Sequence, residues 1–325
     1  MPHAPWSVYI LRCADNSFYT GIARDVAARV RAHGGPRGAA YTRARGPVQL
    51  VYQEAAADRS AALRREYAIK QLSRPEKEAL VTRTDTSAGF PGFRPAALTF
   101  FRKLARNNTK AFFEAHKPIF QAEVQQPLKA LVEEVDVAFA RFAPEITGNP
   151  KRSLFRIYRD VRFSKDKSPY KTHAACWFYH MDAGRGVGGE AEGGAGFYFH
   201  FAPREILIAA GIWMPPRPLV QKIREAIVED QRGFEKLVDS PAFKRRYRGL
   251  DTEGMLKRMP RGFAEDHPAA RWLRYQSFTV ARMLTERELF SPRLVRILAK
   301  DYEALTPYVR WLNRALGYRE MRARI

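Results

Sequence analysis

Cysteine is nearly absent from this chain of 325 residues. It contains only two cysteines, Cys13 and Cys176, which lie far apart in the sequence. Two cysteines cannot make a disulfide framework or a cysteine-based zinc cluster, so both classes of small stabilised domain are excluded. Low cysteine content is typical of proteins in a reducing compartment.

Long apolar runs are also missing. The longest is Ile206 to Met214, and Pro215 and Pro216 end it. Crossing a bilayer takes about 20 apolar residues in a helix, so this run is far too short. The first residues, Met1 to Pro5, lack the basic start and apolar stretch of a signal peptide. We therefore expect a cytoplasmic protein that does not use a membrane.

Acidic residues are scarce relative to basic ones. The chain has 56 Lys and Arg against 34 Asp and Glu, a formal net charge of +22, and its pI is about 10.2. Such a charge bears on partners rather than on the fold, and nucleic acid is the commonest polyanion. An acidic membrane surface or a plain bias in composition would give the same charge.

What is present is enough for two domains. Apolar residues make up 46% of the chain, which allows substantial cores. A small, polar stretch containing Gly and Pro runs from Thr82 to Gly92 and is typical of a linker. We predict a domain over 1–84, a linker over 85–92 and a second domain over 93–325.

Both domains have the patterns of an α+β fold. In the first, strands are predicted at 6–12, 18–19 and 48–52, and helices after Asp25, Asp58 and Ser73, with Ala62, Leu63, Tyr67 and Ile69 as the packing residues of the second helix. In the second, helices are predicted at 95–106, 109–142 with breaks at the prolines, and from 218 to 318, and strands at 153–163, 174–180, 197–202 and 205–213. This order predicts a small three-stranded antiparallel sheet with helices, then a larger and mostly antiparallel sheet with many helices.

The segment from Tyr19 to His33 has the strongest local pattern. It predicts the end of a strand, a turn at Gly21, and a helix that Asp25 caps. Arg29 and His33 are four residues apart and so share one face of this helix. A tyrosine, an arginine and a histidine are thus expected in one place, which suits the handling of phosphate.

These residues carry a resemblance. Ser7-Val8-Tyr9, followed ten residues later by Tyr19-Thr20-Gly21, resembles the two signature triplets of the GIY-YIG nuclease family. The similarity covers about residues 5–82 and is greatest to short bacterial members with a single domain. Segments 41–43 and 58–66 are similar to segments of those members, which makes Arg43 a candidate for contacting nucleic acid. The sequence departs from the family at Ser7, which replaces the first Gly, and at Ile22, where some repair members have Lys.

The resemblance implies a set of catalytic residues. Arg29 and His33 fall where the family has its helical arginine and another polar group, and Glu66 falls where the family keeps its metal-binding carboxylate. One of Tyr9 and Tyr19 is implied to be the general base, although the sequence leaves open which. Each residue alone would more often be a packing or surface residue, but their joint spacing favours the site.

The chemistry of these residue types agrees with this assignment. Glu66 as a single protein ligand suits Mg²⁺ or Mn²⁺, because such an ion keeps water and also binds substrate phosphate. Arg29 is always charged and pairs with phosphate oxygens in a forked geometry. A phenol with a pKa near 10 is a poor base at neutral pH, so nearby cations are expected to lower the pKa of the catalytic tyrosine.

The second domain has a dense basic segment from Lys151 to His173, with eight Lys or Arg residues against two Asp. If 153–163 is a strand, Arg156, Tyr158 and Arg162 share one face of it, and a loop with Lys165, Lys167 and Lys171 follows. This arrangement predicts a phosphate-binding surface with a stacking ring. A structural network of ion pairs with Asp160 and Asp166 is the alternative.

From about Phe90 to Tyr318 the chain resembles a bacterial and fungal family of conserved hypothetical proteins, a domain of unknown function. That resemblance implies no activity. The sequence therefore predicts a Mg²⁺-dependent or Mn²⁺-dependent endonuclease on DNA, with the larger domain binding or targeting nucleic acid and no obligate protein partner. Two alternatives stay open: an inactive nuclease fold that only binds nucleic acid, and a larger domain that acts on a small phosphorylated ligand.

Overall fold

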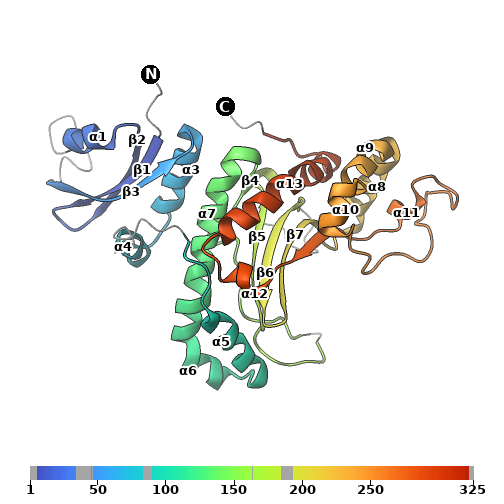
Figure 1. The fold of residues 1–325 in the computed structure, drawn as a ribbon, viewed down its shortest axis with the longest axis horizontal. Helices are drawn as coiled ribbons and strands as arrows, with labels where there is room; N and C mark the ends of the chain where they lie inside the picture. Colours follow the sequence, from blue (N-terminus) through green and yellow to red (C-terminus); the bar gives the residue numbers. More distant parts are fainter. Residues whose placement is uncertain are drawn as a thin grey trace. The chain divides into compact units, whose positions relative to one another are not determined.

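The structure is a computed structural model that describes residues 6–33, 45, 47–82, 90–162, 164–183 and 193–321. The chain divides into two compact units, Met1–Gly89 and Phe90–Ile325. Both are mixed α+β units with antiparallel sheets, as the sequence predicts (Figure 1).

The first unit is built on a three-stranded antiparallel sheet. Its strands are β1 (Trp6–Cys13), β2 (Phe18–Ala23) and β3 (Val48–Ala56), in the order β2-β1-β3. Its helices are α1 (Val26–His33), α3 (Arg59–Lys70) and α4 (Arg74–Thr82). The central strand β1 carries Tyr9 and Leu11, which pack with Val26 of α1 in a small core. The middle of β1 is therefore buried and held on both edges, which makes it a rigid support for a site.

Helix starts in this unit follow the predicted capping residues. The Asp25 carboxylate accepts from the Ala28 N–H at 2.8 Å, and the Asp58 carboxylate accepts from the Ala61 N–H at 2.7 Å. Glu76 accepts from both the backbone N–H and the hydroxyl of Ser73 at 2.7 Å. Each cap satisfies donors that the helix itself leaves free.

The turn predicted at Gly21 is wrong, because β2 continues through this residue to Ala23. Gly21 lies directly opposite Tyr9 in the β1–β2 pair. A Cβ at position 21 would lie 2.6 Å from the Tyr9 hydroxyl oxygen. Glycine is needed here because only a residue without a side chain leaves room for that hydroxyl group.

Helix α3 buries a different set of residues from the one predicted. Ala62 and Ile69 are buried as expected, but Leu63 and Tyr67 are 44% and 65% exposed. Arg65 is buried instead, and its Nε donates to Glu54 of β3 at 3.0 Å. Positions 62, 65 and 69 follow the helical period, so the inward stripe is regular and one of its members is charged.

The larger unit starts with helices. The first are α5 (Pro95–Arg106), α6 (Lys110–Phe120) and α7 (Gln126–Phe142), and a π-helical segment (Gln121–Gln125) joins the last two. The breaks predicted at Pro118 and Pro127 thus become a local change of helix type. Such single-turn π segments are a known way to keep two helical stretches continuous.

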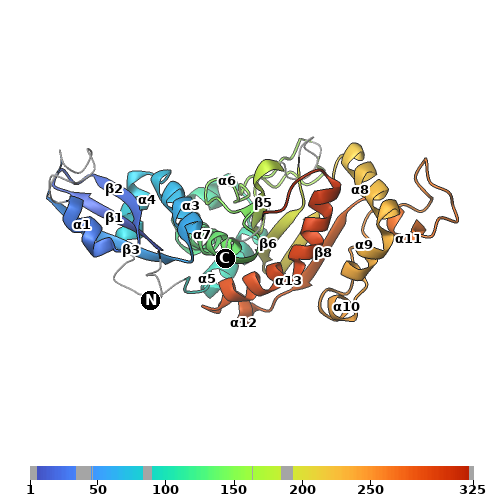
Figure 2. The same ribbon diagram turned by 90° about the horizontal axis from the view of Figure 1, so that it is seen from above.

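A five-stranded antiparallel sheet forms the centre of this unit. Its strands, in spatial and chain order, are β4 (Ile146–Thr147), β5 (Ala174–His180), β6 (Gly196–Ala202), β7 (Glu205–Ile212) and β8 (Phe278–Met283). One face carries apolar side chains such as Phe178, Phe199 and Ile208. Helices α7 and α13 (Leu294–Ala315) lie over this face (Figures 1 and 2).

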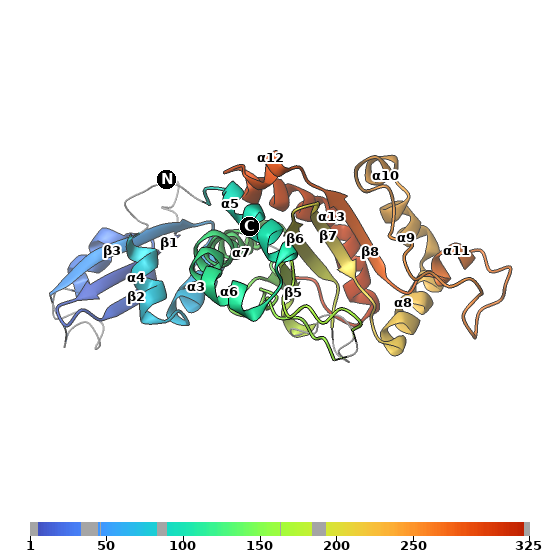
Figure 3. The ribbon, with the colours of Figure 1, turned by 90° about the horizontal axis from the view of Figure 1, so that it is seen from below.

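The remaining short helices are α8 (Arg217–Glu229), α9 (Gln231–Val238), α10 (Pro241–Tyr247), α11 (Ala270–Leu273), α12 (Glu286–Leu289) and the 3-10 turn η3 (Met181–Ala183). Helices α8 to α11 gather at the β8 end of the sheet (Figure 3). None of the helices that the structure describes is long and apolar enough to cross a membrane.

Two strand predictions for this unit are wrong. Residues 153–162 make only isolated bridges, at Leu154 and Tyr158, and do not form the strand predicted over 153–163. Conversely, Phe278–Met283 is a full strand in a region predicted to be helical. Its pairing partner β7 lies some seventy residues earlier (283 − 207 = 76 for Met283 and Leu207), so nothing local in the sequence indicates it.

Candidate active site

The centre of the site in the first unit is the Tyr9 hydroxyl group. Tyr9 projects from the middle of β1, and His33 ends α1. The two side chains are each only 1% exposed, and the Tyr9 Oη and the His33 Nε2 lie 2.9 Å apart. A hydrogen bond of this length fixes the orientation of both rings.

The other predicted residues of the first unit lie around this pair. The Tyr19 ring of β2 is 4.7 Å from the His33 ring and 6.4 Å from the Tyr9 ring, centroid to centroid. Arg29 and Glu66 are both close enough to change the ionisation of the Tyr9 phenol. The structure thus brings Tyr9, Tyr19, Arg29, His33 and Glu66 together from two strands and two helices.

The pKa of Tyr9 is raised, although the sequence predicts that nearby cations lower the pKa of the catalytic tyrosine. Burial raises the pKa of Tyr9 to about 12, and the Arg29 side chain only partly offsets it. Burial and then the charge of Arg29 lower the pKa of His33. His33 is therefore a neutral imidazole at pH 7, and with its proton on Nδ1 its Nε2 can accept the Tyr9 proton.

Glu66 has the setting of a single carboxylate ligand. Its side chain is 16% exposed, and one oxygen lies 2.8 Å from Lys70 Nζ, one helical turn further along α3. Among the described residues, no group of three or more His, Cys, Asp and Glu side chains could hold a metal ion. A lone carboxylate fits a hydrated ion such as Mg²⁺, which takes its other ligands from water and phosphate.

Of the candidates for binding nucleic acid, Arg43 lies outside the described residues. The others lie on the loop from 151 to 171, with Arg156, Tyr158 and Arg162 exposed. Arg162 pairs with Asp160 at 2.7 Å, and Arg159 pairs with Asp166. Part of the positive charge of this loop is therefore balanced within the loop, as the ion-pair alternative predicts.

The other lysines of the loop differ in setting. Lys165 is exposed, and Lys167 donates to the Val161 carbonyl oxygen at 3.0 Å. Lys171 is half-buried, with Nζ 5.3 Å from the centre of the Phe155 ring. Burial and then the charge of Arg156 lower the pKa of Lys171. The predicted shared strand face does not exist, so these residues form an irregular basic loop.

Two family models match different parts of the chain. The family model described as "Conserved hypothetical protein (DUF2461)" matches residues 96–311, which is most of the chain. The model "GIY-YIG catalytic domain" matches residues 5–79. The chain belongs to the DUF2461 family and carries an N-terminal GIY-YIG domain.

Relatives of the GIY-YIG domain are short. The UPF0213 protein of Desulfotalea psychrophila is 54% identical over 77 residues, which are 23% of this chain and 70% of that protein. A UPF0213 protein of Staphylococcus aureus is 53% identical over 74 residues, which are 23% of this chain and 90% of that protein. The solution NMR structure of the UPF0213 protein BH0048 from Bacillus halodurans is 48% identical, with 24% of this chain and 82% of that chain covered and a TM-score of 0.17. The two curated relatives show that the GIY-YIG domain is a nuclease-family domain of the UPF0213 type.

Sequence reasoning treated His173 as structural and missed its partner, His200. The two rings stack with centroids 4.8 Å apart on the sheet face away from α7 and α13. Burial lowers the pKa of each to about 4, and for His173 the neighbouring charges of His200 and Lys171 add to this effect. Glu205 Oε2 lies 3.5 Å from His200 Nε2, but its side chain is half exposed, so burial prevails.

This stacked pair predicts acid sensitivity of the DUF2461 domain. The folded-state pKa of His200 lies below its unfolded value, so the unfolded chain takes up a proton at a higher pH than the folded chain does. The contribution of His200 to stability is therefore fully present above about pH 6.5 and is lost as the pH falls toward 4. For His200 the loss is at most about 3 kcal/mol. The His200→Phe substitution keeps a ring and removes the titration. Denaturant unfolding at pH 8 and pH 4 should show a smaller loss in the variant, and an equal loss would contradict the assignment.

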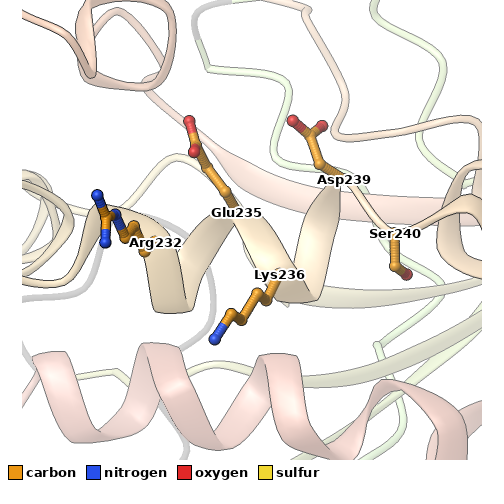
Figure 4. Close-up of a pocket in the computed structure, with 5 residues that line it drawn as sticks. All are labelled: Arg232, Glu235, Lys236, Asp239 and Ser240. Carbon is orange, nitrogen blue, oxygen red and sulfur yellow. The ribbon is translucent and has the colours of Figure 1, made fainter.

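A hollow beside α9 carries no site. Its volume is about 490 Å³, and Figure 4 shows Glu235 and Asp239 on one side of the helix and Lys236 on the other. Trp272 Nε1 donates to Glu235 at 3.0 Å, and Arg271 pairs with both carboxylates. These acidic groups are already satisfied by structural partners.

Proposed function

We propose that the GIY-YIG domain is a Mg²⁺-dependent or Mn²⁺-dependent endonuclease that hydrolyses phosphodiester bonds in DNA. The observation that carries the proposal is the buried Tyr9–His33 hydrogen bond with Arg29 and Glu66 beside it. A buried tyrosine bonded to a neutral histidine is an arrangement for moving a proton. An arginine and a carboxylate beside it supply the charges that a phosphodiester substrate needs.

In this proposal Tyr9 and His33 act together as the base. As water attacks phosphorus and the bond from phosphorus to the leaving ester oxygen breaks, the water proton moves to Tyr9 Oη while the Tyr9 proton moves to His33 Nε2. The leaving oxygen takes up a proton from solvent. Tyr9 then never has to exist as a free phenolate, which its burial would make costly. Tyr19 packs against His33 and holds its ring in position.

Arg29 and Glu66 act on the phosphate. The Arg29 guanidinium group binds its non-bridging oxygens and stabilises the charge that develops on them. Glu66 would hold the metal ion, which polarises the phosphate and shields its charge when bound. Lys70, paired to Glu66, holds the carboxylate in one rotamer.

Cleavage assays test this proposal. The full chain is incubated with single-stranded, double-stranded, nicked and branched DNA, in Mg²⁺, in Mn²⁺ and in EDTA. The proposal requires cutting of at least one DNA form in metal and none in EDTA. Salt-sensitive binding without any cutting would instead support an inactive nuclease fold that binds nucleic acid, and would end the endonuclease assignment.

The DUF2461 domain is proposed to help hold the nucleic acid through its basic loop. Replacing Lys165, Lys167 and Lys171 with Ala removes up to three phosphate contacts. The slope of log affinity against log salt for duplex DNA should then flatten by roughly 2 to 3, since each contact contributes about 0.9. Sequence preference should stay the same, because phosphate contacts carry no sequence information.

Binding titrations at several salt concentrations measure this slope. A control variant loses three exposed lysines elsewhere in the same domain, namely Lys110, Lys222 and Lys300. An equal flattening in both variants would mean that the loop is no more than part of a general positive charge.

A further inference from the structure

The DUF2461 domain has a second basic feature, a cavity of about 580 Å³ at the start of α8. Arg217, Gln221 and Arg224 line it from α8, at positions i, i+4 and i+7 of one helix face. Arg261 and Gln276 line it from the chain segments that pass over this face. Three arginines and two amides thus surround one cavity, and none of its lining residues is acidic.

Arg224 is the most informative of these residues. It is only 8% exposed, and its Nη2 donates to the Tyr275 carbonyl oxygen at 3.1 Å. Its Nε is buried without a hydrogen-bond partner in the part of the chain that the structure describes. Burial lowers the pKa of Arg224, and no carboxylate of the described residues offsets that effect. A buried guanidinium group without a counter-charge is costly, and an anion in the cavity would remove that cost.

The start of helix α8 adds to the positive electrostatic potential of this cavity. Helix α8 begins after Pro216, which offers no side-chain cap, and within its first turn the Leu219 N–H donates to the Pro216 carbonyl oxygen at 2.9 Å. The positive end of the helix dipole lies where Pro215 and Arg217 line the cavity. Met214, also in the lining, has φ of 44°, an unusual value for a residue with a side chain. Backbone strain of this kind is commonly kept where a ligand binds.

A second cavity has a volume of about 370 Å³. Trp213 lines it, and the next residue of the chain, Met214, lines the first cavity, which we call the arginine cavity. It lies on the face of the sheet opposite α13, where Trp177, Tyr198, Ala209 and Ala281 form one cross-strand row. Two aromatic rings next to two small residues leave a flat-walled space.

This aromatic cavity also offers unused polar groups. Trp177 Nε1 and Thr279 Oγ1 are buried and have no hydrogen-bond partner among the described residues. Asp251 is part of the same lining, and its carboxylate accepts from the Glu253 N–H at 2.9 Å. A planar ring with donors and acceptors on its edge would stack on the aromatic side chains and satisfy these groups. Asp251 would repel a phosphate from this end, so the phosphate belongs with the arginines.

We propose that the DUF2461 domain binds a nucleotide, with its phosphate among Arg217, Arg224 and Arg261 and its base against Trp177 and Tyr198. The nucleotide is either free or part of a single strand, since both present the same phosphate and base. This site is separate from the GIY-YIG site, and its existence does not depend on whether that site cuts DNA.

Calorimetry on the full chain tests the proposal. The probes are the four deoxynucleoside 5′-monophosphates, the matching nucleosides and inorganic phosphate. At least one monophosphate should bind about tenfold or more tightly than its nucleoside and than phosphate, because only it fills both cavities. Arg217→Ala and Arg261→Ala, at exposed positions, should each weaken that binding by about tenfold. Arg245→Ala, an equal charge change on α10, should leave it unchanged.

A second variant tests the aromatic cavity. Trp177→Phe should weaken binding of the monophosphate and leave that of inorganic phosphate unchanged. Short single-stranded oligonucleotides that compete with the monophosphate assign the site to a strand, and failure to compete assigns it to a free nucleotide. The proposal is overturned if no monophosphate binds, if nucleosides bind equally well, or if Arg245→Ala causes the same loss as Arg217→Ala.

Discussion

Replacing Glu66 with Ala should reduce metal-dependent DNA cleavage at least about a hundredfold while the fold survives. Glu66 is the carboxylate that acts on Tyr9, and no group of three or more His, Cys, Asp and Glu side chains among the described residues could hold the ion in its place. Losing about 3 kcal/mol of transition-state stabilisation corresponds to a factor of about a hundred. The Lys70 ion pair that is lost with it is a partly exposed i,i+4 pair, worth less than about 1 kcal/mol of stability.

Single-turnover cleavage rates measured across a Mg²⁺ titration check this expectation. Glu66→Gln should behave like Glu66→Ala, because the amide keeps the shape and loses the charge. Glu78→Ala serves as the matched control, since it removes an exposed carboxylate that pairs with Arg74 on α4 of the same domain. Thermal unfolding of all three variants separates lost activity from lost structure. A Glu66→Ala rate close to that of the wild type would remove Glu66 from the site.

The helix caps were reliable local signals in this sequence, whereas the turn predicted at Gly21 was wrong. Asp25, Asp58 and Ser73 each start a helix as predicted, because a cap depends on donors within four residues of it. The GIY-YIG residues also come together from their spacing alone. Tyr9 and Gly21 are cross-strand partners, and α1 follows β2 closely enough to bring His33 to both.

The sequence did not predict the features that depend on contacts between residues far apart in the chain. Strand β8 was missed because it pairs with β7, some seventy residues earlier in the chain, and its Arg282 pairs with Asp301 of α13 at 2.7 Å. Residues 153–162 alternate like a strand, but their basic groups turn to local partners such as Asp160 instead of a neighbouring strand. The inward position of Arg65 likewise depends on Glu54, eleven residues earlier on β3. In each case the structural position of a charged residue can be predicted only when its ion-pair partner is known.

The arginine cavity shows the same limit for function. Arg217 and Arg224 are part of an ordinary amphipathic helix in the sequence, and Arg261 lies in a segment without any pattern. Only the fold shows that Arg224 is buried and that no acidic residue lines its cavity. The basic segment at 151–171 attracts attention in the sequence, but part of its charge is balanced locally. The arginines of the cavity, which the sequence alone does not single out, are therefore the better candidates for binding a ligand.

The Tyr9→Phe substitution should slow cleavage by a factor of about 10² to 10⁴, the usual contribution of a general base. It removes only the hydroxyl group, so the buried ring still packs in the core of the GIY-YIG domain. The lost hydrogen bond to His33 should cost about 1 kcal/mol of stability. Tyr19→Phe should slow cleavage by less than about tenfold, because the ring that packs against His33 remains.

Comparing the two variants in the same single-turnover assay assigns the base. His33→Phe should resemble Tyr9→Phe in rate, and combining both changes should cost little more than either alone, because the two groups handle one proton between them. Additive losses would mean that Tyr9 and His33 act independently. If Tyr19→Phe were the slower variant, the proton would go to Tyr19 instead, and the buried Tyr9–His33 pair would be a structural hydrogen bond at the centre of the sheet.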